Sequence, residues 1–142
     1  MLVYEVIIEG PEVEEIKLVN KEIDSVEVKL DSEKDHAFDR ANDMVGQIRI
    51  KGSILPEGKT KTKNLFKWTL DTEKAKVYRT VTVQIKEDEY NLLREYKFDN
   101  AFVVDYTEEF GTGGKETRDN GKYEILISQR QVNLDQIQIY DN

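Results

Sequence analysis

The sequence predicts a mostly-β fold, a small antiparallel β-barrel or tight sandwich flanked by one α-helix. Three observations predict it: about eight short runs alternate apolar and polar residues, turn residues separate these runs, and a single segment shows helical spacing. Short, evenly spaced strands with turns between them are typical of barrels and sandwiches. The chain has 142 residues, the size of one ordinary domain, so we expect a single domain over residues 1–142.

The strands follow from alternation with period two. In the opening run, Leu2, Tyr4, Val6 and Ile8 share one face and Glu5 lies on the other, before Gly-Pro ends the run. The same pattern predicts strands near residues 26–30, 48–54, 81–85 and 123–127, two strands around residue 100, and a short last strand at 137–139.

The segment over residues 60–75 differs from the rest. Leu65 with Trp68, and Phe66 with Leu70, lie at helical spacings, while lysines occupy the other positions. This spacing predicts one amphipathic helix, which we expect to cover a barrel flank or a sheet edge. The interleaved aromatic and basic residues also fit a binder of single-stranded nucleic acid, but a buried apolar stripe with a solvated basic face is the favoured interpretation.

Charge is divided unevenly along the chain, whose net charge is −8. Residues 1–46 carry −8, residues 47–86 carry +7, and residues 87–142 carry −7. A basic middle between acidic ends fits either a polyanion or the acidic surface of another copy. Because nonspecific nucleic-acid binding depends on positive potential, the acidic total favours self-association. No specific nucleic-acid recognition is expected.

No catalytic, cofactor or metal site is expected from the residue types present. The chain has no Cys and one His, His36, which excludes thiolate sites and zinc sites with several imidazoles. The Asp-rich loop at about residues 31–46 offers oxygen donors, but it has His36 and Asn42 where a calcium loop starting at Asp31 needs Gly and Glu. The serines lie in no nucleophile-elbow context, and the glycine-rich run at 111–117 fits a hairpin connection better than a phosphate-binding loop.

The N-terminus has a charge within five residues and no basic n-region, and no run reaches membrane-spanning length. We therefore expect synthesis in the cytoplasm without a signal peptide and without membrane insertion, and export by another machine or incorporation into a phage-like particle stays open. The loop at 31–46 carries apolar residues that a free linker would lack, so we interpret it as an arm that docks on a partner.

Two segments of the second half carry a family resemblance. Residues 99–110, DNAFVVDYTEEF, and residues 123–129, YEILISQ, flank the glycine-rich loop and resemble the C-terminal hairpin of the haemolysin-coregulated (Hcp-like) tube proteins of type VI secretion. Upstream, residues 39–42 (DRAN), residues 45–50 (VGQIRI) and the helix around Trp68 resemble that group's loop, strand and helix. The resemblance implies the small barrel with one helix that phage tail-tube proteins share.

The resemblance implies a structural subunit with no cofactor and no chemistry of its own. It implies homohexameric rings that stack into a tube of a contractile injection system, a secretion system or a phage tail, with sheath, spike or effector proteins as further partners. The alternative function is a monomeric β-barrel that binds a small ligand or carbohydrate. We expect interface residues in the loop at 31–46, which would reach a neighbouring subunit, and in the basic run before the helix: Asp35, His36, Phe38, Asp39, Arg40, Met44, Lys59, Lys61 and Lys63.

Overall fold

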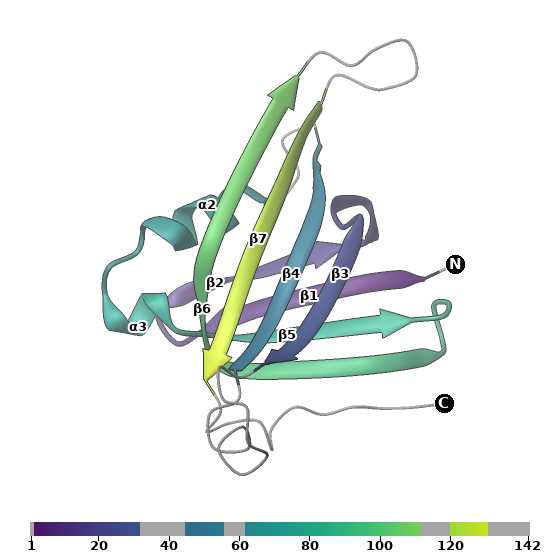
Figure 1. Cartoon of the computed structure of the whole chain (residues 1–142), viewed down its shortest axis with the longest axis horizontal. Helices are drawn as coiled ribbons and strands as arrows, with labels where there is room; N and C mark the ends of the chain where they lie inside the picture. The colour runs from purple at the N-terminus through teal and green to yellow at the C-terminus, as the bar shows by residue number, and fades with distance from the viewer. Residues whose placement is uncertain (1, 32–44, 56–61, 112–119, 131–142) are drawn as a thin grey trace.

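The structure, a computed structural model, describes residues 2–31, 45–55, 62–111 and 120–130. In this part of the chain seven strands form one antiparallel sheet in the order β2-β1-β5-β6-β7-β4-β3 (Figure 1). The mostly-β prediction is therefore confirmed. The strands are β1 (Val3–Gly10), β2 (Val13–Val19), β3 (Ser25–Asp31), β4 (Val45–Ile54), β5 (Arg79–Lys86), β6 (Leu92–Gly111) and β7 (Asn120–Arg130).

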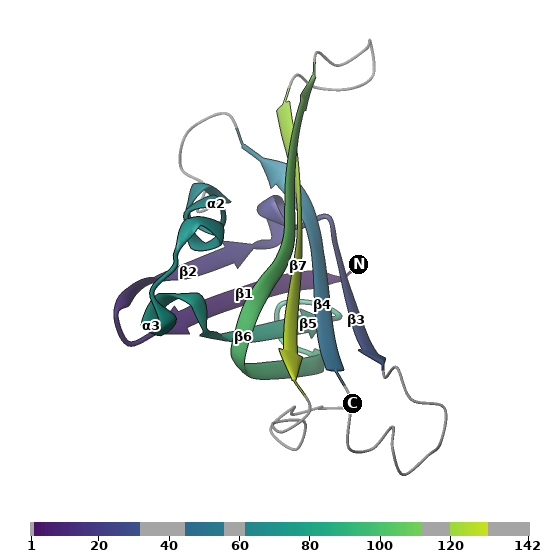
Figure 2. The same ribbon diagram turned by 60° about the vertical axis from the view of Figure 1, so that its left-hand side comes forward.

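The long strand β6 folds the sheet into two layers. Its first half, up to Ala101, pairs with β5, and its second half, from Phe102, pairs with β7. Between them Asn100 has a φ of 53°, a left-handed conformation that Asn adopts more readily than most residues. Figures 1 and 2 show β6 turning here, so that β2, β1 and β5 cross the layer of β3, β4 and β7. The two strands predicted around Asn100 are thus one bent strand.

The core fills the space between the two layers. Most of the alternating residues that predicted the strands point inward, and each layer contributes fully buried side chains, but Leu2 and Leu30 are 43% and 48% exposed. Burying one such side chain contributes about 1.5–3 kcal/mol. Phe98, beside the bend, packs so close to β4 that a Cβ added at Gly46 would lie 2.9 Å from its ring. The fully buried apolar residues of the two layers include Val6, Ile8, Leu18, Val81, Val83, Phe98, Ile48, Ile50, Ile125 and Ile127.

The sheet is not closed as a barrel, which corrects the first of the two predicted architectures. Within the described ranges β2 and β3 stand at the two ends of the strand order, and each has one strand neighbour. The bend in β6 stacks the layers across each other instead of bringing these ends together. The predicted last strand at 137–139 lies outside the described residues. Strand β2 was not predicted, because its acidic start hides the alternation of Ile16 with Leu18, both of which are buried.

The helix predicted over residues 60–75 is divided into α2 (Thr62–Leu70) and α3 (Lys74–Val77). The Trp68 indole N–H donates to the carbonyl oxygen of Val77 over 2.8 Å, and this hydrogen bond ties the end of α3 to α2. Helix α2 lies beside β6 and β2 and covers the open side of the bent sheet, as expected of a flanking helix (Figure 2). Leu65 and Trp68 are buried, but Phe66 and Leu70 stay 44% and 64% exposed.

A tightly packed corner joins the 3-10 turn η1 (Asn20–Glu22) to β4 and β7. The Tyr123 hydroxyl donates to the Glu22 carbonyl oxygen over 2.8 Å. A Cβ added at Gly52 would lie 1.9 Å from that oxygen and 2.6 Å from the Tyr123 ring. Only glycine fits this close approach, the usual reason for a glycine inside a strand. Burial, followed by the nearby Glu22 and Asp24 charges, raises the pKa of the Tyr123 hydroxyl.

Candidate assembly surfaces

Of the predicted interface residues, the structure describes Lys63, which is exposed in the first turn of α2. The other predicted interface residues lie outside the described residues, so their role stays a prediction. They are Asp35, His36, Phe38, Asp39, Arg40, Met44, Lys59 and Lys61.

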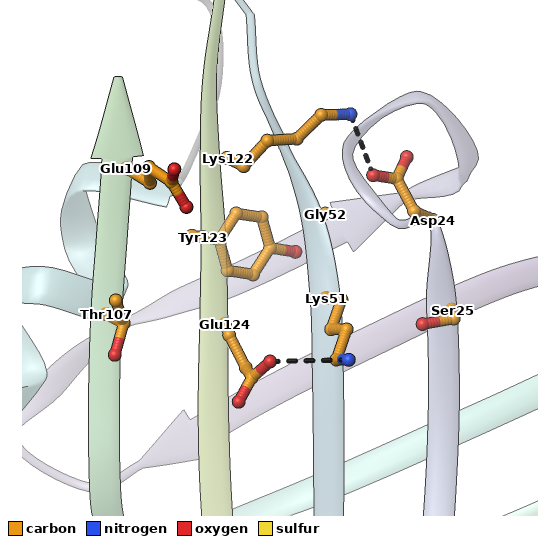
Figure 3. Close-up of a pocket in the computed structure, with 9 residues that line it drawn as sticks. All are labelled: Asp24, Ser25, Lys51, Gly52, Thr107, Glu109, Lys122, Tyr123 and Glu124. Atoms are coloured by element: carbon orange, nitrogen blue, oxygen red, sulfur yellow. Dashed lines mark hydrogen bonds and ion pairs between the residues drawn. The ribbon is translucent and has the colours of Figure 1, made fainter. Parts of the chain in front are cut away.

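The outward side of the layer formed by β3, β4, β7 and the second half of β6 carries mainly polar and charged side chains (Figure 3). We call it the outer face. In its strand register Ser25 lies opposite Lys51, Lys51 opposite Glu124, and Glu124 opposite Thr107. The Lys51 ammonium lies 3.5 Å from the Glu124 carboxylate, and the Lys122 ammonium lies 3.0 Å from that of Asp24. A shallow cavity of about 350 Å³ lies over these residues.

The charges of the outer face largely pair with one another. Glu124 also accepts from Arg49 over 2.5 Å, so one carboxylate faces two cations. Exposed pairs of this kind contribute about 0–1 kcal/mol each and leave little net field for a polyanion. A ligand pocket usually encloses most of its ligand, whereas the cavity on this face is shallow and open to solvent. Its arrangement therefore fits contact with water or a polar surface better than an enclosed small-molecule site.

One serine of the outer face has a lysine within hydrogen-bond distance. The Ser53 hydroxyl lies 2.8 Å from the Lys122 ammonium and 3.4 Å from both Asp24 carboxylate oxygens. A serine nucleophile needs a base that can take its proton. Here the Lys122 ammonium donates to the Ser53 oxygen over 2.8 Å and also pairs with the Asp24 carboxylate at 3.0 Å. The cluster is better explained as a tie between β4, β7 and the start of β3.

The four-stranded layer has two open strand edges. Strand β3 is at one side, and at the other side the second half of β6 pairs with β7 and with no other strand in the described residues. An unpaired edge presents a row of backbone donors and acceptors that another chain can pair with. Helix α2 covers part of the β6 edge, where the rings of Phe66 and Tyr106 meet edge to face at 6.0 Å.

The helical end of the molecule is held to the start of β5 by Arg79. Its side chain is 5% exposed, donates to the Asp71 carboxylate over 2.7 Å and to the Lys76 carbonyl oxygen over 2.9 Å, and lies 5.1 Å above the Trp68 ring. Burial lowers the pKa of the Arg79 guanidinium, and Asp71 partly offsets this shift. Sequence reasoning missed this residue, because nothing in its neighbourhood distinguishes it from an exposed arginine.

The turn between β5 and β6, at the opposite end of β5, is acidic and ordered. The Asp88 carboxylate accepts from the backbone N–H of Tyr90 over 2.8 Å and from that of Asn91 over 3.0 Å. These hydrogen bonds, with that from the Asn91 side chain, lower the pKa of the Asp88 carboxyl. Glu87 and Glu89 flank Asp88, and Tyr90 is 89% exposed. We call residues 87–91 the acidic tip.

Two further observations concern the chemistry open to the described residues. Within the ranges given above, no three His, Cys, Asp or Glu side chains come together as a metal-binding group. The helices in this part of the chain are also too short and too polar to cross a membrane.

Comparison with known proteins identifies the family. The family model described as hemolysin coregulated protein Hcp (TssD) matches residues 22–142, most of the chain. The chain belongs to the Hcp (TssD) family. The family resemblance found in the sequence is therefore confirmed. The matched segment includes β3 to β7 and both helices, but not β1 and β2. No curated protein matches this Hcp-family sequence.

Solved structures show the same fold. Hcp1 from Flavobacterium johnsoniae is 20% identical with a TM-score of 0.55, and the match covers 99% of each chain. Hcp1 from Salmonella typhimurium is 11% identical with a TM-score of 0.53, covering 97% of this chain and 99% of that one. The likeness therefore extends over β1 and β2, which the family model does not reach. At such low identity it concerns the fold of this Hcp-family chain alone.

Proposed function

We propose that this chain is a non-catalytic structural subunit that assembles with copies of itself into rings, which stack into a tube. The tube would belong to a type VI secretion-like system, another contractile injection system or a phage tail. Membership of the Hcp family supports this function. The observation in the molecule that carries it is the four-stranded layer, which among the described residues has no further strand paired at β3 or at the second half of β6.

Strand direction suits pairing between the two edges. Three antiparallel pairings separate β3 from the second half of β6, so these strands run in opposite directions. If β3 of one copy lies beside β6 of the next, the new pair is antiparallel like every other pair in the sheet. Because the two edges differ, repetition of this contact gives a closed ring or an open helix. Ring closure also removes the exposed edges, which otherwise promote aggregation.

Sheath, spike and effector proteins are the further partners of such a tube in this proposal. The alternative, a monomeric binding module, has the shallow cavity of the outer face as its best candidate site. The mutual pairing of charges there, Lys51 with Glu124 and Lys122 with Asp24, argues against it.

Light scattering on the size-exclusion peak, with negative-stain images of the same fraction, tests the proposal. We expect rings of about six copies, or tubes. Two proline variants test the β3 edge itself. In an edge strand, the backbone N–H groups of consecutive residues alternate: one bonds to the neighbouring strand and the next points away from the sheet. The variants are Glu27→Pro and Val28→Pro. Proline at the residue whose N–H points outward removes no hydrogen bond within the sheet, so that variant should keep the wild-type melting temperature of the monomer.

That variant is expected to lose the rings. Val28→Ala is the control for lost packing, since Val28 also packs against the core. Rings that persist in both proline variants would show that the β3 edge is not part of the contact. A monomer at every concentration and salt, for the unmodified chain, would contradict the assembly proposal and favour ligand screening.

A further inference from the structure

The two ends of β5 differ in charge and cannot meet within one copy. Strand β5 has eight residues, and at about 3.3 Å per residue it separates its ends by roughly 26 Å. Helix α3 ends at Val77, with one residue between it and the strand, and the acidic tip directly follows the last residue of the strand, Lys86. Figure 1 shows the helices and the β5–β6 turn at opposite sides of the molecule. A contact between the two ends therefore requires a second copy.

Helix α2 has an outward stripe that combines charge with apolar surface. Lys63, Lys67 and Leu70 are spaced by four and three residues, so they share one face, away from the buried Leu65 and Trp68. Leu70 is 64% exposed and follows Lys67 by three residues, so the face combines an apolar side chain with a cation. We call Lys63, Lys67 and Leu70 the α2 stripe.

The cations of the α2 stripe have no anion partner in the described part of the chain. The two acids that follow α2 are already engaged: Asp71 with Arg79, and Glu73 with Lys76 over 3.5 Å. A cavity of about 260 Å³ that Lys67 also borders is lined by two more acids, Glu12 in the turn before β2 and Glu14 in β2. Asp71 borders the same cavity, so the acidic groups near Lys67 lie on the β2 side of the stripe. Among the described residues, no acidic side chain pairs with Lys63 or Lys67 on the opposite, outward side of the stripe.

The acidic tip has the complementary composition. Glu87 and Glu89 form no ion pair within the described residues, and Tyr90 is an exposed aromatic ring between them and β6. The Asp88 hydrogen bonds fix the turn, so little conformational freedom is lost when the ring is buried in a contact. Tyrosine is enriched among residues that dominate the energy of protein interfaces.

From these observations we infer that the acidic tip of one copy docks on the α2 stripe of the next copy. Tyr90 packs against Leu70, and the carboxylates of Glu87 and Glu89 face the ammonium groups of Lys63 and Lys67. The inference rests on the proposed self-assembly and names a contact within it. Two different surfaces meet, so the contact is head to tail and adds to the pairing of strand edges.

Charge reversal with rescue tests the contact in the full chain. Glu87→Lys/Glu89→Lys should weaken assembly by about tenfold or more in apparent dissociation constant, and so should Lys63→Glu/Lys67→Glu, because each brings like charges together. The variant that combines all four substitutions again places opposite charges on the two surfaces and keeps the net charge of −8. It should therefore assemble like the unmodified chain. All four positions are exposed, and we expect melting temperatures within about 2 °C of the unmodified chain.

The aromatic part of the contact has its own pair of variants. Tyr90→Ala should weaken assembly about tenfold, whereas Tyr90→Phe, which keeps the ring, should stay within about threefold. Rings of the unmodified chain that neither reversal affects would overturn this inference and leave the proposed function standing. Failure of the combined variant to regain assembly would also overturn it. An unmodified chain that stays monomeric would overturn both this inference and the proposed function. The failure of the inference alone can therefore be distinguished from the failure of the proposed function.

Discussion

Side chains pack closely at the corner around Gly52, whereas they are exposed at the two ends of β5. At the corner, a carbonyl oxygen, a buried ring and a glycine fit so closely that no further atom can be added. At the ends of β5, a tyrosine, a leucine and several charges are exposed without an intramolecular partner among the described residues. In our proposal this difference separates folding from assembly: the corner stabilises one copy, and the ends of β5 contact the next copy.

Among the variants that probe this comparison, Gly52→Ala is expected to reduce the free energy of unfolding most. The new Cβ would have to displace the Glu22 backbone or the Tyr123 ring, so we expect a loss of about 3 kcal/mol or more in the free energy of unfolding. Gly111→Ala is the matched control, because a Cβ there meets nothing within 4 Å. Thermal and urea unfolding of the two variants give the measurement. Equal stability would mean that the corner is not closely packed.

Arg79 tests whether the helical end also holds the fold together. Arg79→Met keeps the length of the side chain but removes the pair with Asp71 and the hydrogen bond to Lys76, and we expect a loss of about 2 kcal/mol. Arg49→Met removes a pair of two partly exposed groups and should cost about 1 kcal/mol or less. Urea unfolding compares them. A larger loss for Arg49→Met would contradict the distinction between buried and exposed arginine.

The Tyr123 hydroxyl makes the stability of the corner depend on alkaline pH. Its pKa is raised in the folded state, so the folded chain keeps the proton while the unfolded chain loses it above the ordinary tyrosine value of about 10. Stability from this group is thus complete below pH 10 and falls as the pH rises further. Tyr123→Phe should be about 1 kcal/mol less stable at pH 7, because the Glu22 carbonyl loses its donor.

The difference between Tyr123→Phe and the unmodified chain should shrink between pH 10 and pH 11. Urea unfolding at pH 7, 10 and 11 measures it, and each protein serves as its own control at pH 7. A difference that stays constant with pH would show that this tyrosine ionises as readily in the folded state as in the unfolded one.

The smallest effect on stability is expected from Asp88→Ala at the acidic tip. The variant removes the acceptor for two backbone N–H groups on an exposed turn, so the melting temperature should hardly change while amide exchange at Tyr90 accelerates. Because the pKa of the Asp88 carboxyl is lowered, the unmodified turn should loosen only when acid protonates that carboxylate. Unchanged amide exchange at neutral pH would contradict the ordered tip on which the docking inference depends.

Much of the fold could be predicted from alternation, because local period-two patterns decide which face of a strand is buried. Ile48 with Ile50, and Ile125 with Ile127, were expected to face inward and are fully buried. Closure of the sheet could not be predicted in this way. It depends on pairing between distant strands, and here the left-handed residue Asn100 bends one strand into two layers.

The candidate assembly surfaces were harder to predict from the sequence than the fold. Lys63 was expected at an interface because it lies in a basic run, and the structure leaves it exposed on the same face of α2 as Leu70. The acidic tip was not singled out, although an exposed tyrosine after three acidic residues between two strands is a signal that could have found it. That the acidic tip and α2 lie at opposite ends of the molecule can be seen only when the length and direction of β5 are known.

The central claim, that exposed ends and edges of this chain are covered by further copies of it, is tested most directly by light scattering on the unmodified chain with images of the same fraction. The account predicts rings of about six copies or tubes, which dissociate on charge reversal at the acidic tip and re-form when the α2 stripe is reversed as well. A particle of one copy, 16.6 kDa, at every protein and salt concentration would contradict it.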